Sequence, residues 1–236
     1  MPVLIKALTR TVSSVVNELL PERCGICRTF GELLCSRCAA ELPLPSAGRR
    51  CARCGTLSGA SFCPRCDEYG SDCTSVSGCF GYAGGAKQLI AAVKYGGSHA
   101  LTRSMSHLMA QQWQKLGTAV DAVVAVPLHP RRERSRGFNQ AGFLARWLAL
   151  ELGLPFEPSL VRRRRYTTAQ ARVADELQRR SNVYGAFSSK RGAAAGRRVL
   201  LIDDVTTTGA TFGACALALT EAGAAEVHGL AFAIAD

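Results

Sequence analysis

The stretch VLLIDDVTTTGAT, residues 199–211, decides the fold of this 236-residue chain. Four apolar residues lead to two adjacent carboxylates, Asp203 and Asp204, and a strand buried on both faces accommodates such a pair only where it ends. The loop that follows consists of Thr206, Thr207, Thr208, Gly209, Ala210 and Thr211. A helical pattern over 212–222 comes next. The pattern predicts a buried strand, a tight loop and a helix in direct succession.

These residue types together suit a sugar phosphate. Two carboxylates at a strand tip can accept hydrogen bonds from vicinal hydroxyls. Successive backbone amides and the positive end of a helix dipole attract a phosphate group, and threonine hydroxyls add donors. Gly209 lets the backbone approach the ligand closely because it has no Cβ. The stretch therefore predicts a site for a ribose 5-phosphate.

The rest of the chain from about residue 74 alternates strands with helices. Strand-like runs occupy 75–83, 121–126, 197–205 and 225–235, and helical patterns lie between them. Such alternation predicts an α/β fold, a parallel twisted sheet flanked by helices on both faces. Ligands of these sheets bind outside the carboxyl ends of the strands. The loops after Val126 and Asp203 are therefore the expected site.

The first third of the chain is organised by cysteines. Eight of the eleven cysteines form C-x2-C pairs. Two such pairs complete a tetrahedral zinc site, and four thiolates leave no open position, so structural zinc is expected. We predict two zinc ions bound by sequential quartets, with a crossed arrangement, iron–sulfur clusters and disulfides as the alternatives. The quartets are Cys24, Cys27, Cys35 and Cys38, then Cys51, Cys54, Cys63 and Cys66. Cys73, Cys79 and Cys215 are expected to be buried apolar residues.

Positive charge is concentrated in one segment. The chain has a formal net charge of +11, and residues 129–180 contain twelve arginines, five acidic residues and no lysine. Arginine presents a planar fork suited to phosphate oxygens. The segment predicts an anionic partner, which is a phosphorylated small molecule, a nucleic acid such as single-stranded DNA, or both. A solvated basic surface is the alternative.

The motifs extend into a family resemblance. The 199–211 stretch resembles the 5-phosphoribosyl 1-diphosphate (PRPP) signature of type I phosphoribosyltransferases. With KYGG, VPLHPRR, RGFNQA and TTAQ elsewhere, residues 18–235 are similar to the ComF family, described as a double zinc ribbon joined to a phosphoribosyltransferase domain. The resemblance implies that Asp203 and Asp204 are the catalytic carboxylates and bind the ribose hydroxyls. It also implies that residues 206–211 surround the 5′-phosphate.

Other site residues follow from the same resemblance or from charge. The pyrophosphate side is expected to include Lys94, Pro127, Leu128, His129, Arg131 and Arg136. Magnesium is expected to arrive with PRPP and to use its phosphates as ligands. A mobile loop over 162–180 is expected to close on the substrate, with Arg165, Thr168 and Gln170 as contacts.

The domain organisation is predicted in three parts. Residues 1–23 read as an amphipathic helix, residues 24–73 as the zinc-ribbon module, and residues 74–236 as the phosphoribosyltransferase domain. No apolar run reaches the roughly 20 residues of a transmembrane helix. The amphipathic lead-in lacks the continuous apolar core of a secretory signal, so we expect a cytoplasmic protein.

The sequence is compatible with two functions. The first is transfer of a phosphoribosyl group to an unknown acceptor, with release of pyrophosphate. The second is a non-catalytic factor that senses PRPP or binds single-stranded DNA. The ComF resemblance implies a link to DNA uptake in natural transformation, where other DNA-uptake proteins are possible partners.

Overall fold

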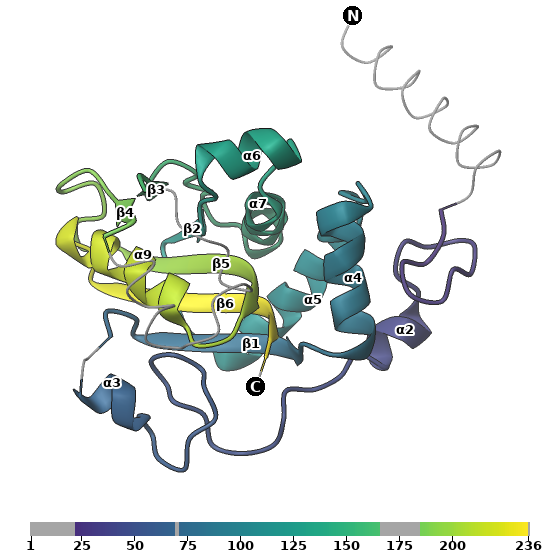
Figure 1. Cartoon of the computed structure of the whole chain (residues 1–236), viewed down its shortest axis with the longest axis horizontal. Coiled ribbons are helices and arrows are strands. Elements are labelled where there is room, and N and C mark those ends of the chain that lie inside the picture. Colours follow the sequence, from purple (N-terminus) through teal and green to yellow (C-terminus); the bar gives the residue numbers. More distant parts are fainter. Residues whose placement is uncertain (1–21, 69–70, 166–184, 236) are drawn as a thin grey trace, which may run out of the picture.

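The computed structural model describes residues 22–68, 71–165 and 185–235 (Figure 1). The amphipathic helix predicted for residues 1–23 lies almost entirely outside these ranges. Thr168 and Gln170, two of the predicted loop contacts, also lie outside them. Among the helices in the described ranges, none is long and apolar enough to cross a membrane.

A four-stranded parallel sheet forms the centre of the molecule (Figure 1). Its order is β1-β6-β5-β2, and every neighbouring pair is parallel. The strands are β1 (Ser75–Gly81), β2 (Ala122–Ala125), β5 (Arg198–Thr206) and β6 (Glu226–Ile234). Both β2 and the apolar half of β5 are fully buried, as the apolar runs predicted.

Side-chain alternation along the strands divides the core into two layers. Leu200 and Ile202 of β5 face one apolar cluster, and Val199 and Leu201 face the other. The first layer is covered by α4 (Gly84–Tyr95), α5 (Leu101–Leu116) and α7 (Gln140–Leu152). The second is covered by α9 (Ala210–Glu221) and by β4 (Phe187–Ser188), which pairs with β3 (Arg162–Arg163).

Local signals set the ends of these helices. The Asn139 side chain caps α7 by accepting a hydrogen bond from the Ala141 amide at 3.1 Å. Gly117 and Gly153 end α5 and α7 in the left-handed conformation. The described residues thus form the predicted α/β fold, with a parallel sheet between helical layers.

The cysteine-rich segment precedes the sheet and contains little regular structure. Its helices are the five-residue α2 (Ser36–Ala40) and α3 (Pro64–Glu68). Backbone hydrogen bonds attach the segment to the sheet, since the Val76 amide donates to Ala52 O at 2.7 Å and the Gly81 amide donates to Pro43 O at 2.8 Å. The segment therefore packs against β1 at two places.

Candidate functional site

The two predicted carboxylates lie where β5 leaves its neighbour β2. Pairing with β2 ends at Ile202, whereas pairing with β6 continues to Thr206. The strand thus runs past the acids, and the open edge on the β2 side begins just before them. Asp204 is buried and Asp203 is half-buried. Asp203 Oδ1 accepts a hydrogen bond from the Asp204 amide at 2.8 Å, which orients the first carboxylate.

Asp204 is held by two side chains from other elements. Lys94 Nζ, in the last turn of α4, lies 2.7 Å from Asp204 Oδ2. Gln140 Nε2, at the start of α7, donates to the same oxygen at 3.4 Å. Lys94 was expected on the pyrophosphate side, and the structure pairs it with Asp204, one of the two predicted catalytic carboxylates. Gln140 was not predicted as a site residue. Its position directly after Asn139, a residue type that caps helices, could have marked it as the first residue of a helix.

The charges at this point are coupled. Burial raises the pKa of Asp203 well above its usual range, and the neighbouring Asp204 carboxylate adds to the effect. Burial alone would lower the pKa of Lys94, but the Asp204 carboxylate reverses this and the pKa is raised. The site therefore keeps Lys94 cationic and places one carboxyl, Asp203, in an environment that disfavours its charge.

The predicted phosphate loop connects β5 to α9. Thr206 still belongs to β5 and is buried, and its carbonyl accepts a hydrogen bond from the Ala235 amide at 2.9 Å. Thr207, Thr208 and Thr211 are only half-buried. Gly209 adopts φ 69° and forms the N-cap of the 12-residue helix α9. The loop therefore places three half-buried threonines at a helix N-terminus, an arrangement that suits an anion.

The opposite wall of the site comes from the segment after β2. His129 Nδ1 accepts a hydrogen bond from the Arg131 amide at 3.1 Å and caps α6 (Pro130–Arg136). Burial lowers the pKa of His129, and the charge of Arg163 and of the α6 arginines lowers it further. His129 is therefore neutral near pH 7 and serves as a helix cap. Pro127 and Leu128, also predicted here, are half-buried in the same turn.

The arginines of this wall do not share one environment. The Arg136 guanidinium lies 6.0 Å from the ring centre of Tyr95 in the KYGG turn, whereas Arg131 is exposed. Arg163 was not singled out from the sequence. Its guanidinium lies 5.2 Å from the Phe187 ring centre, and burial lowers its pKa. Strand alternation within Arg162–Arg165 could have distinguished it, because neighbouring strand residues face opposite sides.

The eight paired cysteines form two clusters, and the predicted sequential grouping is confirmed. In each quartet all Sγ atoms lie within 4.8 Å of one another. The first cluster is Cys24, Cys27, Cys35 and Cys38; the second cluster is Cys51, Cys54, Cys63 and Cys66. No disulfide joins the cysteines, all eleven of which fall in the described ranges. Cys73, Cys79 and Cys215 are buried, as expected.

The donor set of each cluster fits a structural zinc ion. Hydrogen bonds from Thr29 lower the pKa of Cys27 to about 6. Burial raises the pKa of Cys51, but hydrogen bonds with the backbone of Cys63 and with Cys54 outweigh this effect and lower the pKa to about 7. Thiolates are the form that binds zinc, and four of them close the coordination sphere. The clusters are therefore compatible with two structural zinc ions.

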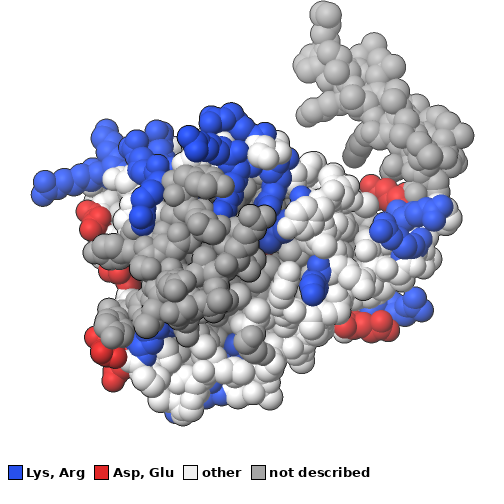
Figure 2. Space-filling view, in the orientation of Figure 1, with Lys and Arg blue, Asp and Glu red and all other residues white. Residues whose placement is uncertain are grey.

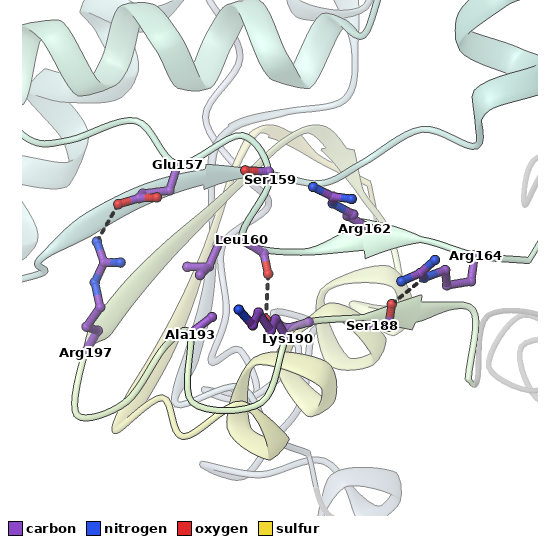
Figure 3. Close-up of a pocket in the computed structure, with 10 residues that line it drawn as sticks. Glu157, Ser159, Leu160, Arg162, Arg164, Ser188, Lys190, Ala193 and Arg197 are labelled. Carbon is purple, nitrogen blue, oxygen red and sulfur yellow. Dashed lines mark hydrogen bonds and ion pairs between the residues drawn. The ribbon is translucent and has the colours of Figure 1, made fainter.

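A basic face lies over α6, β3 and β4. Figure 2 shows lysine and arginine side chains gathered along this edge of the molecule. A cavity of about 580 Å³ opens there beside the β3–β4 pair (Figure 3). Its lining includes four basic residues, and the one acidic residue, Glu157, is paired with Arg197 at 3.0 Å. The basic residues are Arg162, Arg164, Lys190 and Arg197.

Comparison with known proteins places this geometry in context. No family model matches the chain. The DNA utilization protein YhgH of Salmonella typhi is 28% identical over 220 residues, which cover 89% of this chain and 95% of that protein. Competence protein F of Haemophilus influenzae is 36% identical over 110 residues, which cover 46% of this chain and 48% of that protein.

Among solved structures, the glutamine PRPP amidotransferase of B. subtilis superimposes with a TM-score of 0.39 and 26% identity. The superposition covers 56% of this chain and 26% of that longer chain. A likeness at this TM-score is too distant to carry an inference about ligands.

Proposed function

We propose that this chain is a member of the ComF/YhgH family of competence proteins and binds PRPP at the tip of β5. One observation carries the proposal. Two carboxylates, Asp203 and Asp204, immediately precede a threonine–glycine loop that caps a 12-residue helix. A ribose 5-phosphate carries both groups that such an arrangement suits, vicinal hydroxyls for the carboxylates and a phosphate for the loop.

In this proposal the ribose hydroxyls bind the carboxylates and the 5′-phosphate binds the loop. Lys94 and Gln140 orient Asp204, since both contact its Oδ2 atom. The half-buried hydroxyls of Thr207 and Thr208 complement the amides and the dipole of α9. Lys94 is thus a positioning residue for the ribose side of the site.

The segment after β2 would hold the pyrophosphate group. Its backbone turn at Pro127–His129 and the cations of Arg131 and Arg136 supply donors and positive charge. Magnesium, when bound with PRPP, would supply counter-charge to the phosphate oxygens. Arg163 is a further candidate, because its charge interacts with Asp203 and with His129.

The reaction proposed for this site is phosphoribosyl transfer. The bond between ribose C1 and the pyrophosphate oxygen breaks, and its electron pair leaves with pyrophosphate. A nucleophilic nitrogen or other atom of the acceptor forms the new bond to C1. Cations around the leaving group stabilise the charge that develops on it. A link to DNA uptake comes from the names of the related proteins, not from this geometry.

Calorimetry with PRPP and magnesium tests the binding proposal. The double variant Asp204→Asn with Thr208→Ala should lose detectable PRPP binding while it keeps its zinc content and remains folded. A matched control, Thr220→Ala with Glu221→Gln, likewise removes one threonine hydroxyl and one carboxylate, at the exposed far end of α9, and should bind normally. Retained affinity in the first variant would refute the site assignment.

Catalysis is tested separately by pyrophosphate release. Purified protein is incubated with PRPP, magnesium and a panel of nucleobases and amines. Acceptor-dependent release identifies a transferase and its acceptor class. PRPP binding without release across the panel supports the sensing alternative instead.

A second candidate function, binding of single-stranded nucleic acid, is favoured by the basic face. In the cavity of Figure 3, Arg164 is held by Ser188 Oγ at 2.9 Å, and Arg162 and Lys190 lie beside it on an exposed rim. Cations arranged in this way contact phosphates without reading sequence, and the binding weakens steeply with salt. The bound strand would lie beside β3 and β4, apart from the loop that binds the ribose phosphate.

Neutralising this rim tests the second function. Arg162→Gln, Arg164→Gln and Lys190→Gln together should reduce binding to unlabelled single strands and flatten its salt dependence. The control removes three exposed cations elsewhere, with Lys87→Gln, Lys115→Gln and Arg146→Gln. Equal loss in both variants would point to net charge alone, and equal retention would exclude this face.

A further inference from the structure

The second cysteine cluster lies directly against the phosphate loop. Arg65, between Cys63 and Cys66 on α3, donates a hydrogen bond from Nη2 to the carbonyl oxygen of Thr208 at 2.8 Å. The two residues are 143 positions apart in the sequence. A charged donor on a backbone carbonyl is among the stronger hydrogen bonds in proteins. The carbonyl it holds belongs to the residue just before Gly209.

Gly209 makes the second contact. A Cβ at this position would lie 2.7 Å from the carbonyl oxygen of Cys54 and 2.9 Å from its Cα atom. The backbone of the loop therefore rests on the backbone of a cysteine ligand. Gly209 also adopts φ 69°, so glycine is required here for its conformation and for its small size.

The cluster is anchored to the sheet on its other side. The Val76 amide at the start of β1 donates to Ala52 O at 2.7 Å. A Cβ on Gly55 would lie 3.0 Å from Ile234 Cδ1, at the end of β6. The second cluster thus connects the start of β1 and the end of β6 to the loop that follows β5.

Among the described residues, no buried apolar side chain other than the four cysteines belongs to the second cluster. Its buried core consists of the four cysteines themselves, and α3 has only five residues. A segment of this kind depends on bound metal for its fold. The positions of Arg65 and Cys54 therefore depend on the ion that the four thiolates fit.

We propose that the metal-loaded second cluster holds Thr208 and Gly209 in the conformation that binds phosphate, with Arg65 as the positioning residue. Affinity for PRPP is then linked to metal at the second cluster and not at the first. The identity of the ligand, PRPP, rests on the proposed function. The coupling between the second cluster and the loop rests only on the contacts of Arg65 and Gly209.

The first cluster supplies a matched control. Arg37 occupies the equivalent position between Cys35 and Cys38, but it is exposed, and its charge interacts with Cys27. Arg65→Gln and Arg37→Gln therefore make the same chemical change in the same local motif. Only the first removes a hydrogen bond to the phosphate loop.

The experiment compares these two variants with the parent by calorimetry with PRPP and magnesium. Arg65→Gln should weaken PRPP binding about tenfold, and Arg37→Gln should leave it unchanged. Both should keep two zinc ions per chain. Arg65→Lys, which retains one charged donor, should recover part of the affinity. Equal affinities for Arg65→Gln and Arg37→Gln would overturn the proposal.

A readout without ligand separates this proposal from the proposed function. Hydrogen exchange of the amides of residues 207–211 should be faster in Arg65→Gln than in Arg37→Gln or the parent. If the parent does not bind PRPP, the function proposal fails and this exchange result still decides the coupling. Unchanged exchange in Arg65→Gln would show that Arg65 does not position the loop.

Discussion

The two cysteine clusters share one local design and differ in what surrounds them. In each, the amide of the first cysteine donates to the carbonyl of a threonine five residues later, from Cys24 to Thr29 at 2.9 Å and from Cys51 to Thr56 at 2.8 Å. In each, the second thiol contacts the hydroxyl of that threonine, at 3.2 Å and 3.3 Å. The same spacing therefore produces the same turn twice.

Their surroundings separate them. All four ligands of the second cluster are buried, whereas Cys27 and Cys35 of the first are half-buried. The first cluster packs on helices α4 and α5, since a Cβ on Gly25 would lie 3.1 Å from Leu101 Cδ1. The second contacts the phosphate loop through Cys54. Local sequence thus determines the metal turn, and tertiary contacts determine which turn supports the ligand site.

The largest expected effect comes from removing one metal at a time. The parent should contain two zinc ions per chain by elemental analysis. Cys54→Ser with Cys66→Ser should leave one, lose more than about 4 kcal/mol of unfolding free energy, and abolish PRPP binding, because loss of a structural metal removes the main stabilisation of its segment.

The equivalent change in the first cluster is Cys27→Ser with Cys38→Ser. It should also leave one zinc ion, but calorimetry should still detect PRPP binding. If both variants lose PRPP binding equally, the proposed difference between the two clusters is wrong. A parent ratio of one zinc per chain would overturn the two-site assignment itself.

The next largest effect concerns the contact between the loop and the cluster. Gly209→Ala should cost about 2–4 kcal/mol, because it combines an unfavourable left-handed residue with overlap against the Cys54 backbone. Gly117→Ala has the same conformational cost, since Gly117 adopts φ 63°, but open space surrounds its Cβ position. Urea unfolding should therefore show a loss of only about 1 kcal/mol for Gly117→Ala. Equal losses would mean that the Cys54 contact is not tight.

Much of this architecture is readable from local sequence. The apolar run at 199–202 predicted a strand buried on both faces, and the C-x2-C spacings predicted two tetrahedral clusters, because both are properties of neighbouring residues. The two layers of helices followed from the alternation of strands and helices along the chain.

The contacts that shape the site were not predicted. The pairing of Lys94 with Asp204 and the hydrogen bond from Arg65 to Thr208 join residues more than 100 positions apart. Their geometry depends on how α4 and α3 pack, which residue spacing does not encode. Arg65 could have been noticed as one of two arginines at the same place in the cysteine motif, but nothing in the motif distinguishes it from Arg37.

The carboxylates that precede the phosphate loop can be tested in the same way as the second cysteine cluster that packs against it. The raised pKa of Asp203 means that the folded state holds this proton to a higher pH than the unfolded chain does. Its contribution to stability is therefore lost as pH rises through the folded pKa. Asp203→Asn should raise Tm at pH 7, by roughly 2–4 °C per kcal/mol gained, and should weaken PRPP binding.

The pH profile provides the check on this interpretation. The gain in Tm for Asp203→Asn over the parent should shrink as pH is lowered below the pKa of Asp203, since the parent carboxyl is then neutral as well. Thermal unfolding between pH 4 and pH 8 measures it. A lower Tm for the variant at pH 7 would contradict the assigned cause, and zinc content should not change.

The smallest effect returns to the turns themselves. The residue after the second cysteine is left-handed in both clusters, Arg28 at φ 63° and Gly55 at φ 78°. A Cβ on Gly55 would make a tight contact of 3.0 Å with Ile234 Cδ1, whereas Arg28 is exposed, so the first cluster accommodates a residue with a Cβ more easily. Arg28→Gly should relieve the left-handed strain and raise the unfolding free energy by about 0.5–1 kcal/mol, because that strain slightly exceeds the entropic cost of glycine. A urea midpoint below that of the parent would mean that the Arg28 side chain stabilises the first cluster, which would then depend on more than its shared turn.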